Sequence, residues 1–349
     1  MKVTTMEYGQ FLVNSPVNFT GTYFADTVED LEHDSVYRFL KGSRLTPSLL
    51  REKMTDVVVY SSRGRVLFDD SVMDKYASQK IEGAVKQYSG NAHHVVTGIG
   101  VVTCVYYNPD TKRFYPLDYR IYDIARDGKT KLDHVTDMLS ELVKQEPVRG
   151  PFFTHVLMDS WYATAELLNK IMDWNKLFVC AIKNNRLFSP DQVDQQGKHI
   201  QTAVKDLDWD NPEADPSPNT YGYHGRLKGL PKKRLLRLFR IVVSSDKTEY
   251  IVTNDVTLQT TEDVRTESAI RWKIEEFHRE LKQLTGIEKC QARKNRSQRN
   301  HIAMAMVAWC QLKTKAWATN RTIYQVKRDP LQAFVAEQWR HPATVFSLG

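Results

Sequence analysis

The stretch "RWKIEEFHRELKQ", from Arg271 to Gln283, combines an arginine, two adjacent glutamates, a histidine and a lysine. At about 100° per residue of helix, its charged and titratable side chains fall on one narrow stripe. That stripe consists of Arg271, Glu275, His278 and Lys282. An apolar stripe lies beside it, formed by Ile270, Ile274, Phe277 and Leu281. We therefore expect a helix that docks by its apolar stripe and presents either ordinary surface ion pairs or one wall of an active site.

Two other segments end in aspartates directly after apolar runs. "VLFDD" ends in Asp69 and Asp70, and "HVLMD" ends in Asp159. A carboxylate at the end of an apolar strand lies at the edge of the sheet where open α/β sheets bind ligands. Each aspartate alone could also cap a helix, and Asp159 precedes the helical pattern "SWYATAELL". Together with Glu275, however, these carboxylates can hold two Mg²⁺ ions about 4 Å apart, which activate a water and stabilise a leaving oxygen in phosphoryl transfer.

The composition limits the class of protein. The 349 residues are 41% hydrophobic and 26% charged, and the formal net charge of +7 weakly favours an anionic partner such as nucleic acid. The four cysteines lie far apart and form no CxxC pair, so we expect neither a zinc site nor a disulfide framework, and a reducing cytoplasm fits. The N-terminal segment lacks the apolar run of a signal peptide.

The pattern of elements divides the chain into five regions. Residues 1–62 are helical, with one helix over "DTVEDLEHDSVYRFLKGS" and another starting at Thr46-Pro47. Residues 63–182 read as three strands, helix, strand, helix, strand, which predicts a mixed α/β sheet. Residues 183–258 form a strand-rich insertion with long polar loops. Residues 259–315 return to helix, with one helix from Thr261 to Leu284, and residues 316–349 form a C-terminal region.

Two basic segments flank the proposed site in sequence. "RLKGLPKKRLLRLFR", from Arg226 to Arg240, holds seven lysines and arginines, and "ARKNRSQRN" covers residues 292–300. Either could be a solvated loop, but together they favour a groove for a DNA backbone. Within the first segment, the residues after Gly229-Leu230-Pro231 are expected in an exposed turn. Arg237 and Arg240 alternate with apolar residues of a strand.

The order Asp, Asp, then Glu within "RWKIEEFHRELK" resembles the bacterial insertion-sequence transposases of the DDE class. One branch of that class has the signature Tyr, two residues, Arg, three residues, Glu, six residues, Lys. Arg271, Glu275 and Lys282 match it in type and spacing, whereas Ser268 stands at the tyrosine position. The resemblance covers about residues 55–315. It implies an α/β fold, an RNase H-like mixed sheet with a strand-rich insertion before the last catalytic helix and small helical terminal regions.

The resemblance also implies roles for individual residues. Asp69, Asp159 and Glu275 would be the catalytic carboxylates that bind Mg²⁺, with Mn²⁺ as a substitute. Asp69 is preferred over Asp70, the alternative, because the family often reads Asp-x-Thr/Ser and "DDS" supplies Ser71. The aromatic residue of the insertion would be Tyr250, in "TEYIVTND". The residues expected to contact DNA are Arg271, Lys282, Ser268, His278, Lys232, Lys233, Arg234 and Tyr250.

The implied partners are the terminal inverted repeats and the target DNA, bound by a homodimer in a synaptic complex, with no membrane. Residues 1–62 would bind the DNA ends and residues 316–349 would support dimerisation, in the bacterial cytoplasm at the nucleoid. Two alternatives remain at this point: a non-transposing RNase H-like nuclease, and a domesticated relative that only binds DNA. A metabolic α/β enzyme is disfavoured, since the sequence holds neither a glycine-rich phosphate loop nor a nucleophile elbow.

Overall fold

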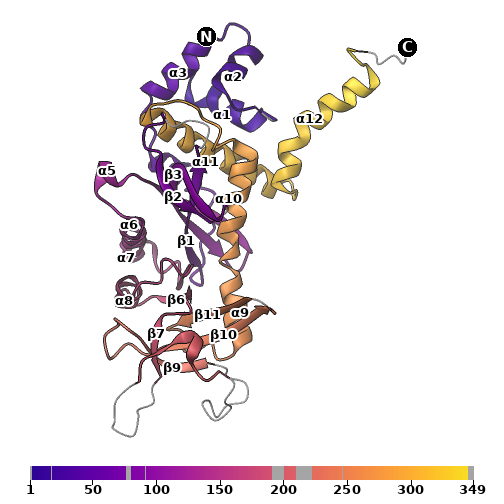
Figure 1. Cartoon of the computed structure of the whole chain (residues 1–349). Coiled ribbons are helices and arrows are strands. Elements are labelled where there is room, and N and C mark those ends of the chain that lie inside the picture. The colour runs from indigo at the N-terminus through magenta and orange to yellow at the C-terminus, as the bar shows by residue number, and fades with distance from the viewer. Residues whose placement is uncertain are drawn as a thin grey trace. The chain divides into compact units, whose positions relative to one another are not determined.

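The computed structural model describes residues 2–16, 18–75, 80–90, 92–190, 200–209, 222–245 and 247–344 (Figure 1). The chain folds into two compact units. The first comprises Met1–Val58, Ser71–Val101 and Glu276–Gly349, and the second comprises Val59–Asp70 and Val102–Glu275. Most of the polar loops expected in the insertion, at 191–199 and 210–221, lie outside the described residues.

A large mixed sheet forms the second unit. Its strands run in the order β3-β1-β5-β6-β11-β10-β9-β7-β8, and β4 also pairs with β3. Their bounds are β1 Arg65–Asp74, β3 His94–Asn108, β4 Arg113–Tyr122, β5 His155–Met158, β6 Leu177–Ile182, β7 Leu187–Pro190, β8 Thr202–Ala203, β9 Gly222–Leu227, β10 Leu236–Ser244 and β11 Lys247–Thr253. The neighbours β1, β5 and β6 are parallel, whereas β6 to β11 and the later pairs are antiparallel. The mixed α/β sheet predicted from the sequence is therefore confirmed.

The helices between these strands begin at polar caps. α6 (Lys131–Val143) starts with a capping box on Thr130, and α8 (Ala165–Asp173) is capped by the Thr164 hydroxyl. The sequence predicted a helix from about residue 160, but residues 160–162 form a turn instead. The short helices α5 (Ile124–Asp127) and α7 (Glu146–Arg149) and the 3₁₀ turn Val204–Asp206 complete the connections of this unit.

Two predicted boundaries were wrong in the segments that carry the expected carboxylates. β1 does not end at Asp70 but continues to Asp74, because Ser71, Val72 and Met73 are also buried. The single helix expected from Thr261 to Leu284 is broken into α9 (Thr261–Ala269) and α10 (Trp272–Thr285). The break is a tight turn in which the amides of Ile270 and Arg271 bond three residues back, to the carbonyls of Glu267 and Ser268.

The first unit is built around one long helix. α11 (Asn295–Ala318) is buried on nearly all sides and contacts α1 (Thr5–Asn14), α3 (His33–Gly42), α4 (Pro47–Met54) and α12 (Ile323–Arg340). The strand β2 (Val85–Ser89) pairs with the first part of β3 in this unit. The single helix expected over residues 26–43 was wrong: α2 (Gly21–Thr27) ends before Asp30, whose left-handed backbone (φ 59°) no helix can pass through.

A buried ion pair anchors α10 on α11 in the first unit. The Glu280 carboxylate accepts hydrogen bonds from Trp309 Nε1 at 3.0 Å and from Lys313 Nζ at 2.8 Å, and burial raises its pKa. We expect Lys313→Met to lower the free energy of unfolding by about 3–5 kcal/mol, because it leaves this carboxylate buried without a cation. Urea unfolding measures the loss. The exposed Lys315 on the same helix supplies the control, since Lys315→Met should change stability by no more than about 0.5 kcal/mol.

Candidate active site

The register of two parallel strands brings two aspartates to the same edge of the sheet. Between β1 and β5 it runs from Arg65 opposite His155 to Phe68 opposite Met158. Asp69 follows Phe68 and Asp159 follows Met158, so the two carboxylates leave neighbouring strands at equivalent positions. This is the carboxyl end of parallel strands, where the sequence predicted a ligand site.

Glu275 reaches the same place from α10. Its apolar neighbours Ile274, Phe277 and Leu281 are fully buried, as the predicted apolar stripe requires. The docked helix places a carboxylate oxygen of Glu275 within 4.8 Å of one from Asp69. Two carboxylates at this separation repel each other unless a proton or a cation lies between them.

The pKa values of Asp69 and Asp159 show that holding these carboxylates together in ionised form is unfavourable. Burial raises the pKa of Asp69 well above its ordinary value, and the negative charges of Glu275, Asp159 and Asp70 raise it further. Burial also raises the pKa of Asp159, against the opposing influence of the Trp161 amide and the Arg271 guanidinium. The cluster therefore lacks the positive charge needed to hold all its carboxylates ionised.

Asp70 lies in a different environment, because successive side chains of a strand point to opposite faces. Its carboxylate pairs with Lys131 Nζ at 2.6 Å and accepts a hydrogen bond from the Tyr162 hydroxyl at 2.6 Å. The same lysine lies 5.9 Å from the ring of Trp161. Asp70 thus has a full set of partners within the protein, whereas Asp69 faces Glu275.

Asp159 does not cap the helix that follows it, so that alternative was wrong. Its Oδ1 atom accepts the amides of Trp161 at 2.9 Å and Tyr162 at 3.4 Å, and Thr164 caps α8. This short turn holds the carboxylate at the end of β5. The turn also presents Trp161, which is 46% exposed.

The charged stripe around Glu275 is engaged within the protein. Arg271 lies in the turn before α10 and pairs with Glu275 at 3.4 Å, as a surface ion pair would. Lys282 Nζ donates to the Val72 carbonyl at 2.9 Å and pairs with Glu288 at 2.9 Å. His278 is only 4% exposed, and Ser268 is half-buried in α9. A DNA contact by each of these four residues stays a prediction.

The basic segment from Arg226 to Arg240 spans the turn between β9 and β10. Lys232 and Lys233 are exposed there, as expected. Arg234 pairs with Asp173, and the buried Arg237 donates to the Leu258 carbonyl at 2.9 Å. The accessible positive charge of the segment is therefore smaller than its composition suggests.

Tyr250 lies in β11 with its ring 5.6 Å from that of Trp209, which sequence reasoning had not singled out. Trp209 also lies 5.7 Å from the Arg240 guanidinium. Tyr250 is therefore part of an aromatic group on the strand-rich region rather than an isolated ring.

The second basic segment, residues 292–300, includes the start of α11. Arg293, Lys294 and Arg296 are exposed, with Lys294 paired to Glu82 at 2.7 Å. Asn300 is buried and accepts the Leu45 amide at 2.9 Å. Half of this segment therefore packs in the first unit instead of forming a basic loop.

Sequence reasoning missed a buried ion pair at the opposite end of β1. The Arg65 guanidinium binds the Glu267 carboxylate of α9 through two nitrogens. A signal was present, because Glu267 lies three residues after the buried Val264 and three before Ile270, in line with the apolar stripe. A charged residue at an inward position of a helix predicts a buried partner.

Within the described ranges, no helix combines the length and apolar character needed to cross a membrane. No curated protein matches the sequence. Among solved structures, the NurA nuclease from Sulfolobus solfataricus is 11% identical, with 71% of this chain and 93% of that chain covered. Its TM-score of 0.24 is too low to bear on function.

The family described as "Transposase DDE domain" matches residues 61–311, which include β1, β5 and α10 with their three carboxylates. The matched region is more than half of the chain. Its mixed sheet and flanking helices agree with the RNase H-like fold expected from the resemblance. The chain belongs to the DDE transposases, enzymes that bind DNA and use divalent metal ions in DNA transposition and recombination.

Proposed function

We propose that this protein is a bacterial insertion-sequence transposase of the Tyr-Arg-Glu-Lys branch, acting on nucleoid DNA. It would cut phosphodiester bonds at the terminal inverted repeats and join the freed ends to target DNA. The observation that carries the proposal is the meeting of Asp69, from β1, with Glu275, from α10, beside the equivalent strand position of Asp159. Within the described residues, no feature favours the nuclease without transposition.

The donor set fits a divalent cation. Asp69, Asp159 and Glu275 offer hard carboxylate oxygens, the ligands that Mg²⁺ and Mn²⁺ prefer. Burial and the neighbouring carboxylates raise the pKa of Asp69, so a bound cation would stabilise its ionised form. Bound Mg²⁺, in a two-ion arrangement, would supply an activated water and stabilise the leaving oxygen of the cut strand.

The remaining residues of the site would position the DNA strand and the carboxylates. Arg271 pairs with Glu275 and has 25% of its side chain exposed, and it would contact a phosphate oxygen when DNA binds. Asp70 would act through its pairing with Lys131, which keeps that cation at the edge of the site. Ser268 and Tyr250 would add contacts from α9 and from the strand-rich insertion, residues 183–258.

The turn between β9 and β10 would track the DNA backbone. We expect the triple variant Lys232→Ala, Lys233→Ala, Arg234→Ala to bind all DNA sequences more weakly, and to show a salt dependence shallower by roughly one unit of slope per lost phosphate contact. Filter binding at several salt concentrations measures both. Because Arg234 also pairs with Asp173, the single variant Arg234→Ala is the matched control. Unchanged affinity and slope in the triple variant would leave residues 292–300 as the candidate DNA groove.

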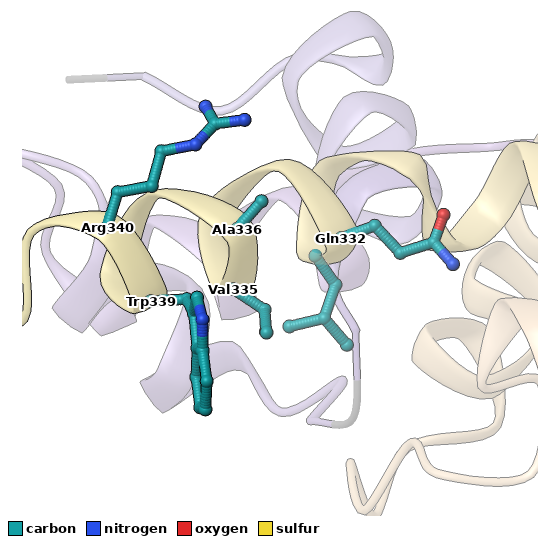
Figure 2. A pocket seen from close by; sticks show the side chains of 6 residues that line it. Gln332, Val335, Ala336, Trp339 and Arg340 are labelled. Carbon is teal, nitrogen blue, oxygen red and sulfur yellow. The ribbon is translucent and has the colours of Figure 1, made fainter.

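The C-terminal helix would join two copies in the synaptic complex. Leu331, Val335 and Trp339 recur every four residues along the exposed second half of α12, and Trp339 is 90% exposed. Figure 2 shows Val335 and Trp339 projecting from the same side of the helix. Both line a shallow hollow of about 470 Å³. Such a stripe can pair with its own copy in a second chain, because a two-fold axis brings identical surfaces together.

We expect Trp339→Glu to convert a complex of two chains with two terminal-repeat DNAs into one chain per DNA. Light scattering on the protein–DNA complex measures the mass. Ala333→Glu adds the same charge at an exposed position about 120° around α12 from Trp339, and it should leave the mass unchanged. A complex of two chains with the Trp339 variant would place the dimer contact elsewhere.

One experiment tests the proposed reaction as a whole. The protein is incubated with DNA carrying the repeats that flank its gene, with Mg²⁺, and the ends of the products are mapped. We expect cuts at the repeat boundary and, when target DNA is added, joined products. Cuts scattered over any DNA, with no joining, would support the nuclease without transposition.

A further inference from the structure

A chain of buried hydrogen bonds crosses the second unit at the end of the sheet opposite the carboxylates. It begins at Glu267 of α9, whose carboxylate is held by the Arg65 guanidinium at both oxygens, one contact measuring 3.1 Å. Only 11% of the Glu267 side chain and 14% of the Arg65 side chain are exposed. A planar guanidinium that binds a carboxylate through two nitrogens fixes orientation as well as distance.

The chain of bonds continues through β5 to the connection before α9. Arg65 Nη1 donates to Thr154 Oγ1 at 3.0 Å, and that oxygen lies 2.8 Å from His155 Nδ1. His155 Nε2 lies 2.9 Å from Asp255, which accepts both the amide and the hydroxyl of Thr257. Burial lowers the pKa of His155, so the ring is neutral at pH 7. β1, β5, α9 and the start of the connection between β11 and α9 are thus tied together.

The lengths of the two segments that run from this network to the carboxylates match. From Arg65 to Asp69 the strand covers four residues, about 13 Å at 3.3 Å per residue. From Glu267 to Glu275 the helical segment covers eight residues, about 12 Å at 1.5 Å per residue. Asp69 and Glu275, which meet at the other end, therefore lie at matching distances from the clamp between Arg65 and Glu267.

We propose that Arg65 and Glu267 are positioning residues, which set the separation of the Asp69 and Glu275 carboxylates. The inference rests on the proposed function, in which these carboxylates hold the metal ions. The turn at Ile270–Arg271 is closed by hydrogen bonds from these two amides to the carbonyls of Glu267 and Ser268, so the position of α9 is passed on to α10. A slip of α9 by one residue along β1 would move Glu275 by about 1.5 Å, enough to separate the metal ligands.

The test compares Mn²⁺ binding by the wild-type protein and by Glu267→Gln, followed by electron paramagnetic resonance of free Mn²⁺. We expect the variant to bind Mn²⁺ about 10- to 100-fold more weakly, the range found when groups that orient metal ligands are removed. DNA affinity without metal should be unchanged. The cleavage rate, measured well below the unfolding temperature, should fall with the metal affinity.

Two further variants separate positioning from mere stability. Val135→Ala opens a small cavity in α6, away from the network, and should lower the unfolding temperature while leaving Mn²⁺ affinity at the wild-type value. Arg65→Lys keeps the charge, loses the two-nitrogen contact and should weaken Mn²⁺ binding in the same direction, by less. If Glu267→Gln does not fold, the Mn²⁺ affinity of Arg65→Lys tests the positioning role instead.

The outcomes distinguish the inference from the proposed function. If the wild-type protein binds no Mn²⁺ and cuts no DNA, the metal site itself is contradicted and the positioning role falls with it. If the wild-type protein binds and cuts, but Glu267→Gln and Arg65→Lys lose only thermal stability, the metal site stands and the positioning role is overturned.

Discussion

Glu275→Gln should fold, bind DNA and cut it several orders of magnitude more slowly than the wild-type protein. Glutamine keeps the shape of the side chain but removes the charge that holds a divalent cation against Asp69. Gel-based cleavage of labelled terminal-repeat DNA measures the rate, and a binding assay without metal shows that the DNA site survives.

Glu276→Gln supplies the matched control for this variant. Glu276 is the next residue of α10, and its carboxylate lies 3.7 Å from Lys313 in the first unit, not at the aspartates. We expect it to cut at close to the wild-type rate. Glu275 would not be a metal ligand if Glu275→Gln cut at a near-normal rate, or if both variants lost the same amount of cleavage activity.

The second large effect separates Asp69 from Asp70. We expect Asp69→Asn to abolish cleavage and Asp70→Asn to reduce it to a measurable rate, because only Asp69 faces Glu275 while Asp70 acts through Lys131. In the absence of metal, the two substitutions should also change the unfolding temperature in opposite directions. Asp69→Asn should raise the unfolding temperature, since it removes repulsion among buried carboxylates, and Asp70→Asn should lower it, since it breaks the pairing with Lys131 and Tyr162.

Calorimetry without metal and a cleavage assay with Mg²⁺ together measure these effects. The reverse ranking of cleavage, with Asp70→Asn inactive and Asp69→Asn active, would transfer the metal-binding role to Asp70. A lower unfolding temperature for Asp69→Asn would show that the charge of Asp69 is already compensated in the metal-free wild-type protein.

The segments that carry the three proposed metal ligands were predictable because each has a strong local pattern. Apolar runs ending in Asp69 and Asp159 predict buried strands, and Ile274, Phe277 and Leu281 predict the docked face of α10; the structure has all three elements. The meeting of Asp69 with Asp159 depends on the register between β1 and β5. Register is set by pairing across the sheet, which a single sequence does not display.

The element boundaries needed information that local patterns lack. β1 continues past Asp70 because burial of Val72 and Met73 outweighs the turn tendency of two adjacent aspartates. The break between α9 and α10 contains neither glycine nor proline, so no residue at Ile270–Arg271 predicts it. The roles of Lys131 and Arg65 were invisible for a related reason. Each is an ordinary basic residue until the fold supplies its buried carboxylate partner.

The central claim is that Asp69, Asp159 and Glu275 together hold the catalytic metal ions. Anomalous diffraction from crystals soaked in Mn²⁺ tests it most directly, because Mn²⁺ is located by its own scattering. We predict Mn²⁺ bound by the carboxylates of Asp69, Asp159 and Glu275, with the Asp70 carboxylate still paired to Lys131. Mn²⁺ bound at Asp70 instead of Asp69, or no Mn²⁺ at these carboxylates in crystals of a protein that cuts DNA, would contradict the account.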